Sequence, residues 1–183
     1  TRHTIKGFPE REVHAYPLKL SAHWQIKYEL SDPQPNQPPQ HLLSPELGFQ
    51  ADDAGFNWAS GDERIKWLAN FLLENTGNKV LVITSSANTA LGIAEQVRLK
   101  VGIKAAVFHE GMSLVERDRG AAFFADHETG TQVLICSEIG SEGRNFQFAH
   151  HMVLFDLPVN PDLLEQRIGR LDRIGQNAII IIH

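Results

Sequence analysis

From residue 79 onward, short apolar runs alternate with amphipathic segments, and this alternation limits the possible folds more than any other feature of the sequence. The apolar runs have the length of strands and lie at 79–84, 103–109, 131–136, 151–156 and 178–182. Strands that alternate with helices favour a parallel sheet with helices on both of its faces. The sequence therefore predicts an α/β domain with three layers and a parallel sheet.

Four segments carry helix signals, and they lie at 60–74, 87–100, 113–125 and 160–173. Capping-box pairs open the first and the third of them. These pairs are Ser60 with Glu63 and Ser113 with Glu116. Asn160 and Pro161 suit the N-cap and the first position of the fourth. Residues 11–20 alternate between apolar and polar, which predicts one further strand.

Residues 1–57 differ from the rest of the chain in their pattern. Four prolines lie between residues 33 and 39, which favours a linker or an exposed loop. We therefore expect an extension at 1–57 and a compact domain at 58–183. The sequence starts without methionine and stops within an apolar run, so we expect a fragment of a longer protein.

Composition excludes several classes of function. The net charge is −5, so a nucleic acid would have to bind a local patch rather than an overall basic surface. The single cysteine, Cys136, lies in an apolar run and is expected to be buried, without a disulfide. No metal site is predicted, because neighbouring residues such as His150 and His151 point to opposite sides of a strand. No apolar run has the length of a membrane-spanning helix, and we expect a cytoplasmic protein.

Three arginines, at positions 167, 170 and 173, lie in the predicted helix 160–173. At about 100° per residue, two of them share a polar face opposite an apolar face, and Arg167 lies between the faces. The apolar face holds Leu164, Ile168 and Leu171, and the polar face holds Gln166, Arg170 and Arg173. Guanidinium groups bind phosphates with paired hydrogen bonds, and Gly169 is a poor helix residue that would permit close approach of a ligand. The alternative is solvation or pairing with nearby carboxylates, and Arg167 suits such a local salt bridge.

The stretch QRIGRLDRIGQ at 166–176 resembles motif VI of superfamily 2 helicases and translocases, and its RIGQ ending is typical of Swi/Snf-type ATPases. KVLVITSSANTA at 79–90 resembles motif IV of this group, and SEIGSEGRNFQ at 137–147 resembles motif V. The resemblance covers residues 1–30 and 58–183. The segment FDLPVNPDLLEQRIGRLDRIGQ is similar to the corresponding segment in a bacterial branch of this group whose members associate with RNA polymerase.

This resemblance implies the second RecA-like lobe of a motor in which two lobes enclose ATP. It implies that Arg170 and Arg173 are arginine fingers that reach the γ-phosphate. The remaining residues that match nucleotide contacts are Gln166, Asn145 and Gly143, and those that match nucleic-acid contacts are Ser85, Ser86, Ser137 and Gly140. Ser85 and Ser86 could equally cap a helix, and the glycine-bearing loop could be a plain connecting turn. Glu138 and Glu142 would repel a phosphate unless arginines pair with them.

The sequence contains no GxxxxGK[ST] loop, so ATP and Mg²⁺ are expected to be held mainly by a first lobe that this chain lacks. We expect ATP hydrolysis by the full-length protein and none by this fragment alone. The resemblance implies three partners: RNA polymerase, a nucleic acid that is DNA or RNA, and the first lobe. It also implies that the protein is associated with the nucleoid in the cytoplasm. Two other functions stay open: a non-catalytic module that docks to polymerase, and a small Rossmann-like nucleotide-binding domain. The absence of GxGxxG after the first strand counts against the latter.

Overall fold

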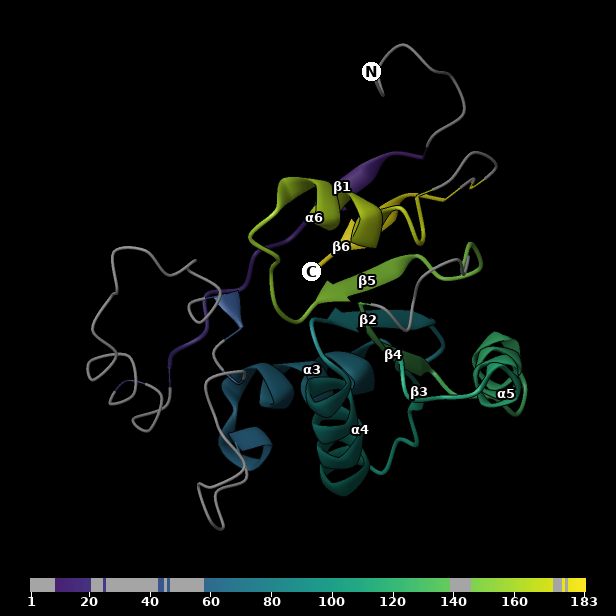
Figure 1. Ribbon diagram of the computed structural model, residues 1–183, viewed down its shortest axis with the longest axis horizontal. Coiled ribbons are helices and arrows are strands. Elements are labelled where there is room, and N and C mark those ends of the chain that lie inside the picture. The colour runs from purple at the N-terminus through teal and green to yellow at the C-terminus, as the bar shows by residue number, and fades with distance from the viewer. Residues whose placement is uncertain are drawn as a thin grey trace.

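The computed structural model describes residues 9–20, 25, 43, 44, 46, 58–138, 146–172, 176 and 178–183. In this part of the chain, six parallel strands form one sheet in the order β1-β6-β5-β2-β4-β3 (Figure 1). The strands are β1 (Arg11–Val13), β2 (Val80–Thr84), β3 (Ala106–Phe108), β4 (Val133–Ser137), β5 (His151–Leu154) and β6 (Ile180–Ile182). The helices are η3 (Trp58–Gly61), α3 (Glu63–Glu74), α4 (Ala87–Val101), α5 (Leu114–Ala125) and α6 (Pro161–Ile168). The predicted parallel α/β sheet is therefore confirmed.

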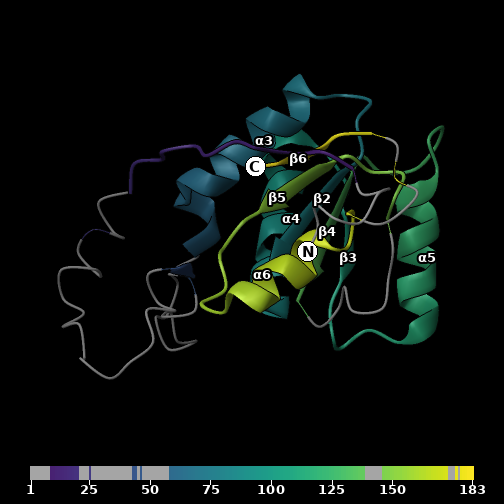
Figure 2. The same ribbon diagram turned by 90° about the horizontal axis from the view of Figure 1, so that it is seen from above.

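Helices cover both faces of the central strands. Because side chains alternate along a strand, Val80 and Val82 of β2 face one side and pack in one core cluster with α3 and α4. Leu81 and Ile83 face the other side, in a second cluster with Phe124 of α5 and residues of α6. All five residues of β2 are buried, and so are all five of β4. The alternation of apolar runs thus produces the three-layer arrangement seen in Figures 1 and 2.

The helix starts follow the predicted caps in two of three cases. Ser113 and Glu116 form the expected capping box of α5. Asn160 caps α6, and its side chain accepts a hydrogen bond from the backbone N of Asp162 at 2.9 Å. The capping box predicted at Ser60 is wrong. Asp62 is the N-cap of α3 instead, because its carboxylate lies one residue before the helix and accepts from the backbone N of Arg64 at 2.8 Å.

The predicted helix 160–173 ends early, at Ile168, with Gly169 as its C-cap. Beyond it the backbone tightens, since the N–H groups of Arg170 and Leu171 donate to carbonyls three residues back, each at 3.1 Å. A Cβ on Gly169 would meet only carbonyls of α6 itself. Gly169 thus ends the helix, and the close approach of a ligand there stays a prediction. Ile168 and Leu171 are buried as predicted.

The strand predicted at 11–20 is limited to Arg11–Val13, which pairs with β6 at the edge of the sheet (Figure 2). One backbone hydrogen bond extends this pairing, from the N of His14 to the O of Ile182 at 2.8 Å. A segment of the predicted extension 1–57 therefore supplies an edge strand. The division of the chain at residue 58 stays a prediction.

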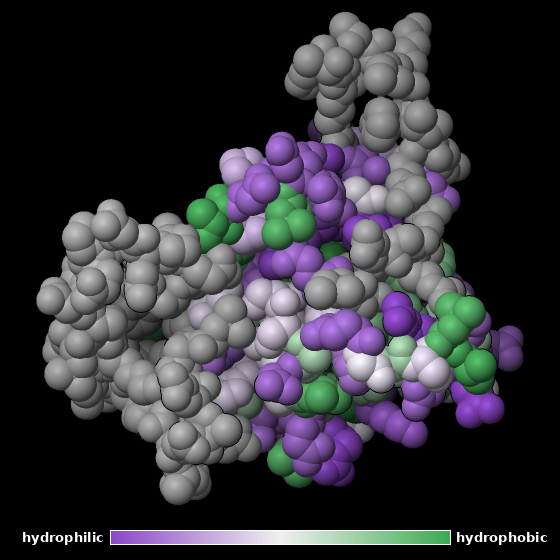
Figure 3. Space-filling view, viewed as in Figure 1, coloured by the Kyte–Doolittle hydropathy of each residue, from purple (hydrophilic) through white to green (hydrophobic). Residues whose placement is uncertain are grey.

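The face seen in Figure 3 carries hydrophobic residues in small separate groups among hydrophilic ones, as far as the described residues go. Exposed hydrophobic side chains of this kind include Leu114 and Val115 at the start of α5, which are 67% and 58% exposed. Within the same part of the chain, no helix is long and apolar enough to span a membrane. Cys136 is buried as expected, and burial raises the pKa of its thiol.

Three histidines gather where β1, β5 and β6 meet α3. Nδ1 of His151 and Nε2 of His183 share a hydrogen bond at 3.0 Å, and the ring centroid of His14 lies 5.6 Å from that of His183. Burial lowers the pKa of His183 to about 4, and the neighbouring His151 and His14 act in the same direction, whereas Glu12 opposes them. Burial also lowers the pKa of His151. Both rings are therefore neutral in the folded chain near pH 7.

The folded chain should lose stability as the pH falls from about 6.5 towards 4. The unfolded chain binds a proton at His183 near pH 6.5, whereas the folded chain binds it only near pH 4, so acid favours unfolding in this window. Chemical denaturation at several pH values measures the free energy of unfolding. In the His183→Gln variant, this free energy should vary less with pH between 6.5 and 4. An unchanged slope would contradict the assignment.

Candidate functional site

Several predicted site residues lie at the carboxyl ends of the strands, where ligands of parallel sheets bind. Ser85 and Ser86 follow β2, and Ser137 ends β4. Gln166 lies on the exposed side of α6, and Arg170 lies in the turn after α6. The other predicted residues fall outside the part of the chain that the structure describes, and they are Gly140, Gly143, Asn145 and Arg173.

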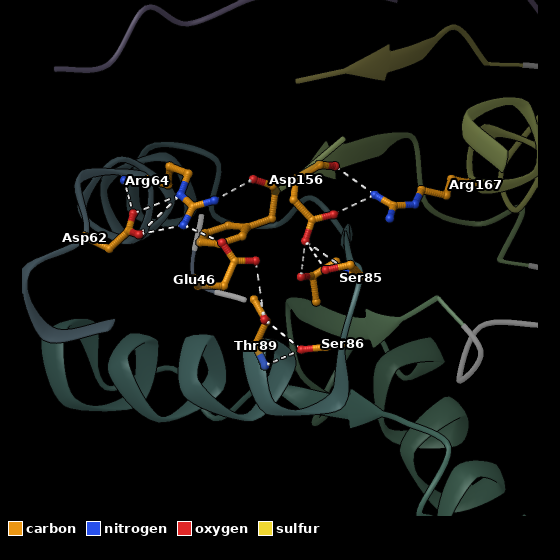
Figure 4. A network of polar contacts seen from close by, with 10 residues as sticks. Glu46, Asp62, Arg64, Ser85, Ser86, Thr89, Asp156 and Arg167 are labelled. Carbon is orange, nitrogen blue, oxygen red and sulfur yellow. Dashed lines mark hydrogen bonds and ion pairs between the residues drawn. The ribbon is translucent and has the colours of Figure 1, made fainter. Parts of the chain in front are cut away.

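Asp156, two residues beyond β5, is the centre of a buried polar network (Figure 4). Its Oδ2 accepts hydrogen bonds from Oγ1 of Thr84 at 2.6 Å, from the backbone N of Ser85 at 2.8 Å and from Oγ of Ser85 at 2.9 Å. Its Oδ1 accepts from Nη1 of Arg167 at 2.9 Å. The side chain is fully buried. One carboxylate thus joins the loop after β2 to α6.

Arg167 is used inside the domain, as the sequence suggested. Its side chain is 2% exposed, and its Nη1 also donates to the backbone O of Asp156 at 2.7 Å. Its Nε donates to Oε1 of Glu138 at 2.9 Å. Burial opposes the charge of Arg167, but the bonds to Glu138 and Asp156 outweigh it and raise the pKa. Glu138 was expected to repel a phosphate unless an arginine pairs with it, and Arg167 provides this pairing.

A second ion cluster lies on the α3 side of Asp156 (Figure 4). Nη2 of Arg64 donates to Oδ2 of Asp62 at 2.7 Å and to Oε2 of Glu46 at 2.9 Å. The guanidinium carbon of Arg64 lies 4.2 Å from the ring centroid of Phe155. Burial raises the pKa of Glu46, against the attraction of Arg64. This cluster fixes the start of α3 next to the end of β5.

The predicted serines differ in what their hydroxyl groups do. Oγ of Ser86 accepts from the backbone N of Thr89 at 3.1 Å, so this serine caps α4. Oγ of Ser137 donates to Oε2 of Glu110 at 2.7 Å, and this bond lowers the pKa of Glu110. Ser137 is buried, whereas Ser85 is partly exposed. The role of these three residues towards a nucleic acid stays a prediction.

Arg170 is held in place by its backbone. Its N–H donates to the O of Arg167 at 3.1 Å, and its O accepts from the N of Phe146 at 3.3 Å. Its side chain is partly exposed, and its positive charge opposes the rise in the pKa of Cys136. Arg170 therefore connects the end of α6 to Phe146.

Sequence reasoning missed Arg11, whose guanidinium group binds one carboxylate before Arg170 in the sequence and one carboxylate after it. Nη1 of Arg11 donates to both oxygens of Glu165, at 3.0 and 2.9 Å. The same guanidinium is paired with the buried Asp172. The sequence left pairing of the motif VI arginines with nearby carboxylates open, and Arg11 binds two carboxylates of this region, Glu165 and Asp172. No local pattern could identify this contact, because Arg11 and Asp172 are separated by 161 positions.

A cavity of about 590 Å³ lies next to Asp156, and none of the predicted site residues lines it. It opens beside Arg64 and Trp67 and is lined mainly by apolar side chains, such as Tyr16 and Leu157. In the described ranges, no group of three or more His, Cys, Asp or Glu side chains is arranged to hold a metal ion. The candidate site is therefore the open edge around Ser85, Gln166 and Arg170.

Comparison with known proteins shows the family of the chain. The profile of the helicase conserved C-terminal domain matches residues 63–175, which is more than half of the chain. The chain belongs to the helicase C-terminal domain family. It is 54% identical over 189 residues to RNA polymerase-associated protein RapA of Sodalis glossinidius (strain morsitans), and 56% identical over 187 residues to RapA of Pseudomonas aeruginosa (strain LESB58). Both alignments include 100% of this chain but only 20% and 19% of the relatives. This helicase C-terminal domain thus spans about a fifth of the relatives' length.

Solved structures share the fold of this helicase C-terminal domain. The C-terminal part of the Fun30 ATPase domain aligns with a TM-score of 0.57 and 22% identity, over 75% of this chain and 44% of that chain. The E. coli DEAD-box protein SrmB aligns with a TM-score of 0.56 and 20% identity, over 65% of this chain and 68% of that chain. The SWI2/SNF2 ATPase core of Sulfolobus solfataricus aligns with a TM-score of 0.51 and 21% identity, over 63% and 23%. The predicted RecA-like lobe is confirmed as the fold.

Proposed function

We propose that this chain is the second motor lobe of a Swi/Snf-type ATPase that translocates on double-stranded DNA and acts on transcription complexes. The helicase family and the RecA-like fold support a motor lobe. Identity of 54–56% to RNA polymerase-associated RapA supports the action on transcription. Because the chain spans about a fifth of these relatives, ATP turnover belongs to the complete protein, where a first lobe completes the site.

The position of Arg170 carries this proposal. Two arginines of the carboxyl edge, Arg167 and Arg170, are three positions apart in the sequence. The guanidinium group of Arg167 is bound to Asp156 and Glu138 inside the domain. Arg170 follows α6 with its backbone anchored and its side chain partly exposed, beside the exposed Gln166. We expect its guanidinium to meet a ligand held between two lobes.

The residues of this lobe fit a nucleotide through positive charge and hydrogen-bond donors. When bound, Mg²⁺ and ATP supply the γ-phosphoryl group that is transferred to water. Arg170, with Arg173, would donate hydrogen bonds to oxygens that gain negative charge in the transition state. Gln166, Asn145 and Gly143 would contact the nucleotide from the same edge. Mg²⁺ itself would be held mainly by the first lobe.

The loops after β2 and β4 would contact the track. Ser85 and Ser86 lie at the start of α4, where backbone N–H groups and the helix dipole favour a phosphate. Ser137 and Gly140 would contribute from the next loop. All three hydroxyl groups already take part in hydrogen bonds inside the lobe: Ser85 with Asp156, Ser86 with Thr89 and Ser137 with Glu110.

Turnover of ATP by the complete protein, with and without duplex DNA, tests the proposal. We expect duplex DNA to raise the rate, and the isolated 183-residue chain to hydrolyse no ATP. Single-stranded RNA in place of DNA identifies the preferred track. A complete protein that binds RNA polymerase but hydrolyses no ATP under either condition would be a docking module and would overturn the proposal.

A further inference from the structure

The hydroxyl group of Ser85 has a single proton, and Asp156 already binds it. A serine hydroxyl can donate only one hydrogen bond, and a phosphate oxygen can only accept. Oγ of Ser85 donates to Oδ2 of Asp156 at 2.9 Å. A nucleic-acid phosphate that accepts from Ser85 therefore has to take this proton away from Asp156.

The same carboxylate holds the helix that leads to Arg170. Oδ1 of Asp156 accepts from Nη1 of Arg167, which is 2% exposed and has no solvent to replace its partner. The backbone O of Arg167 in turn accepts from the N of Arg170. The path from Ser85 to Arg170 thus consists of three direct contacts, and Figure 4 shows the first two, from Ser85 to Asp156 and from Asp156 to Arg167.

From these contacts we propose that Asp156 is a positioning residue that couples the nucleic-acid loop at Ser85 to the arginine finger at Arg170. Loss of the Ser85 hydroxyl bond leaves Oδ2 with two donors, Oγ1 of Thr84 and the backbone N of Ser85. The carboxylate then shifts towards its remaining partners, and Arg167 moves with it. Binding of the track thereby changes the placement of Arg170 before ATP is hydrolysed. This inference rests on the proposed function.

A purely structural network would behave differently. Thr84 is fully buried and donates to the same oxygen as Ser85, but no phosphate can reach it. If Asp156 only ties the strand ends together, Thr84→Val and Ser85→Ala should have similar effects. If Asp156 couples the loop to Arg170, only the bond that a phosphate can replace should matter for stimulation by DNA.

The test uses the complete protein and compares ATP turnover at saturating duplex DNA with turnover in its absence. Asp156→Asn retains the Ser85 hydroxyl but offers one acceptor atom instead of two, so we expect the stimulation ratio to fall about tenfold. Its affinity for DNA should not fall, because a neutral amide holds the Ser85 proton less strongly than a carboxylate does. Asp62→Asn is the matched control, because it removes another buried, arginine-paired carboxylate outside the path, and it should retain the wild-type ratio.

A second set of variants decides the matter if Asp156→Asn does not fold. Ser85→Ala at saturating DNA should reduce the ratio towards one, whereas Ser85→Thr, which keeps the hydroxyl, and Thr84→Val should retain it. Equal ratios in Ser85→Ala and Ser85→Thr, or a wild-type ratio in a folded Asp156→Asn, would overturn the coupling. An unstimulated wild-type protein would overturn the proposed function instead.

Discussion

Replacement of Arg170 by alanine is expected to lower the kcat of ATP hydrolysis by the complete protein about 10³–10⁵-fold. A guanidinium that meets the transferring phosphoryl group stabilises the charge of the transition state, and alanine offers neither charge nor donors. The backbone of Arg170 is anchored through the O of Arg167 and the N of Phe146, so the turn should keep its conformation in the variant. The loss should therefore appear in turnover rather than in folding.

Steady-state turnover at saturating ATP and DNA, together with thermal denaturation of the same samples, measures this prediction. Arg170→Lys should be intermediate, because an ammonium keeps the charge but not the planar pair of donors. Arg98→Ala is a suitable control, since the side chain of Arg98 on α4 is 55% exposed and pairs with the exposed Glu95, a contact of small energetic value. A kcat for Arg170→Ala within tenfold of the wild type would contradict the role of Arg170 as a finger.

The sequence pattern predicted the fold well because it reflects burial. Apolar runs such as 79–84 correspond to strands buried on both faces, and the helices between them follow the expected order. The ends of elements were less predictable. α6 stops five residues before the predicted end, because Gly169 has a low helix propensity, and Leu171 is buried beyond the end of the helix.

The candidate site was predictable only where its residues carry their own signal. The role of Arg167 as a salt-bridge residue followed from its place on the helix surface and is confirmed by its pairs with Glu138 and Asp156. The partners themselves were not predicted. Asp156 was noted only as the end of an apolar run, although it accepts from Thr84, which lies 72 positions earlier. Contacts of this range depend on strand order, which local spacing does not encode.

Replacement of Arg167 by alanine is expected to destabilise the folded chain by about 3–5 kcal/mol. The change leaves the carboxylate of Asp156 fully buried without its cationic partner. It also removes the guanidinium group that donates hydrogen bonds to Glu138. A buried, uncompensated charge costs far more than the loss of a surface contact. Lys66→Ala provides the comparison, because its exposed pair with Glu63 should contribute less than about 1 kcal/mol.

Chemical denaturation of the chain gives the free energy of unfolding for each variant. Because the cost in Arg167→Ala comes from the charge left on Asp156, the double variant Arg167→Ala with Asp156→Asn should be more stable than the sum of the two single effects. Strict additivity, or a loss below about 1 kcal/mol in Arg167→Ala, would show that the pair is not buried in solution. If the expected results are obtained, experiment distinguishes two arginines that are three residues apart. Arg167 then contributes to the stability of the lobe, and Arg170 contributes to the turnover of ATP.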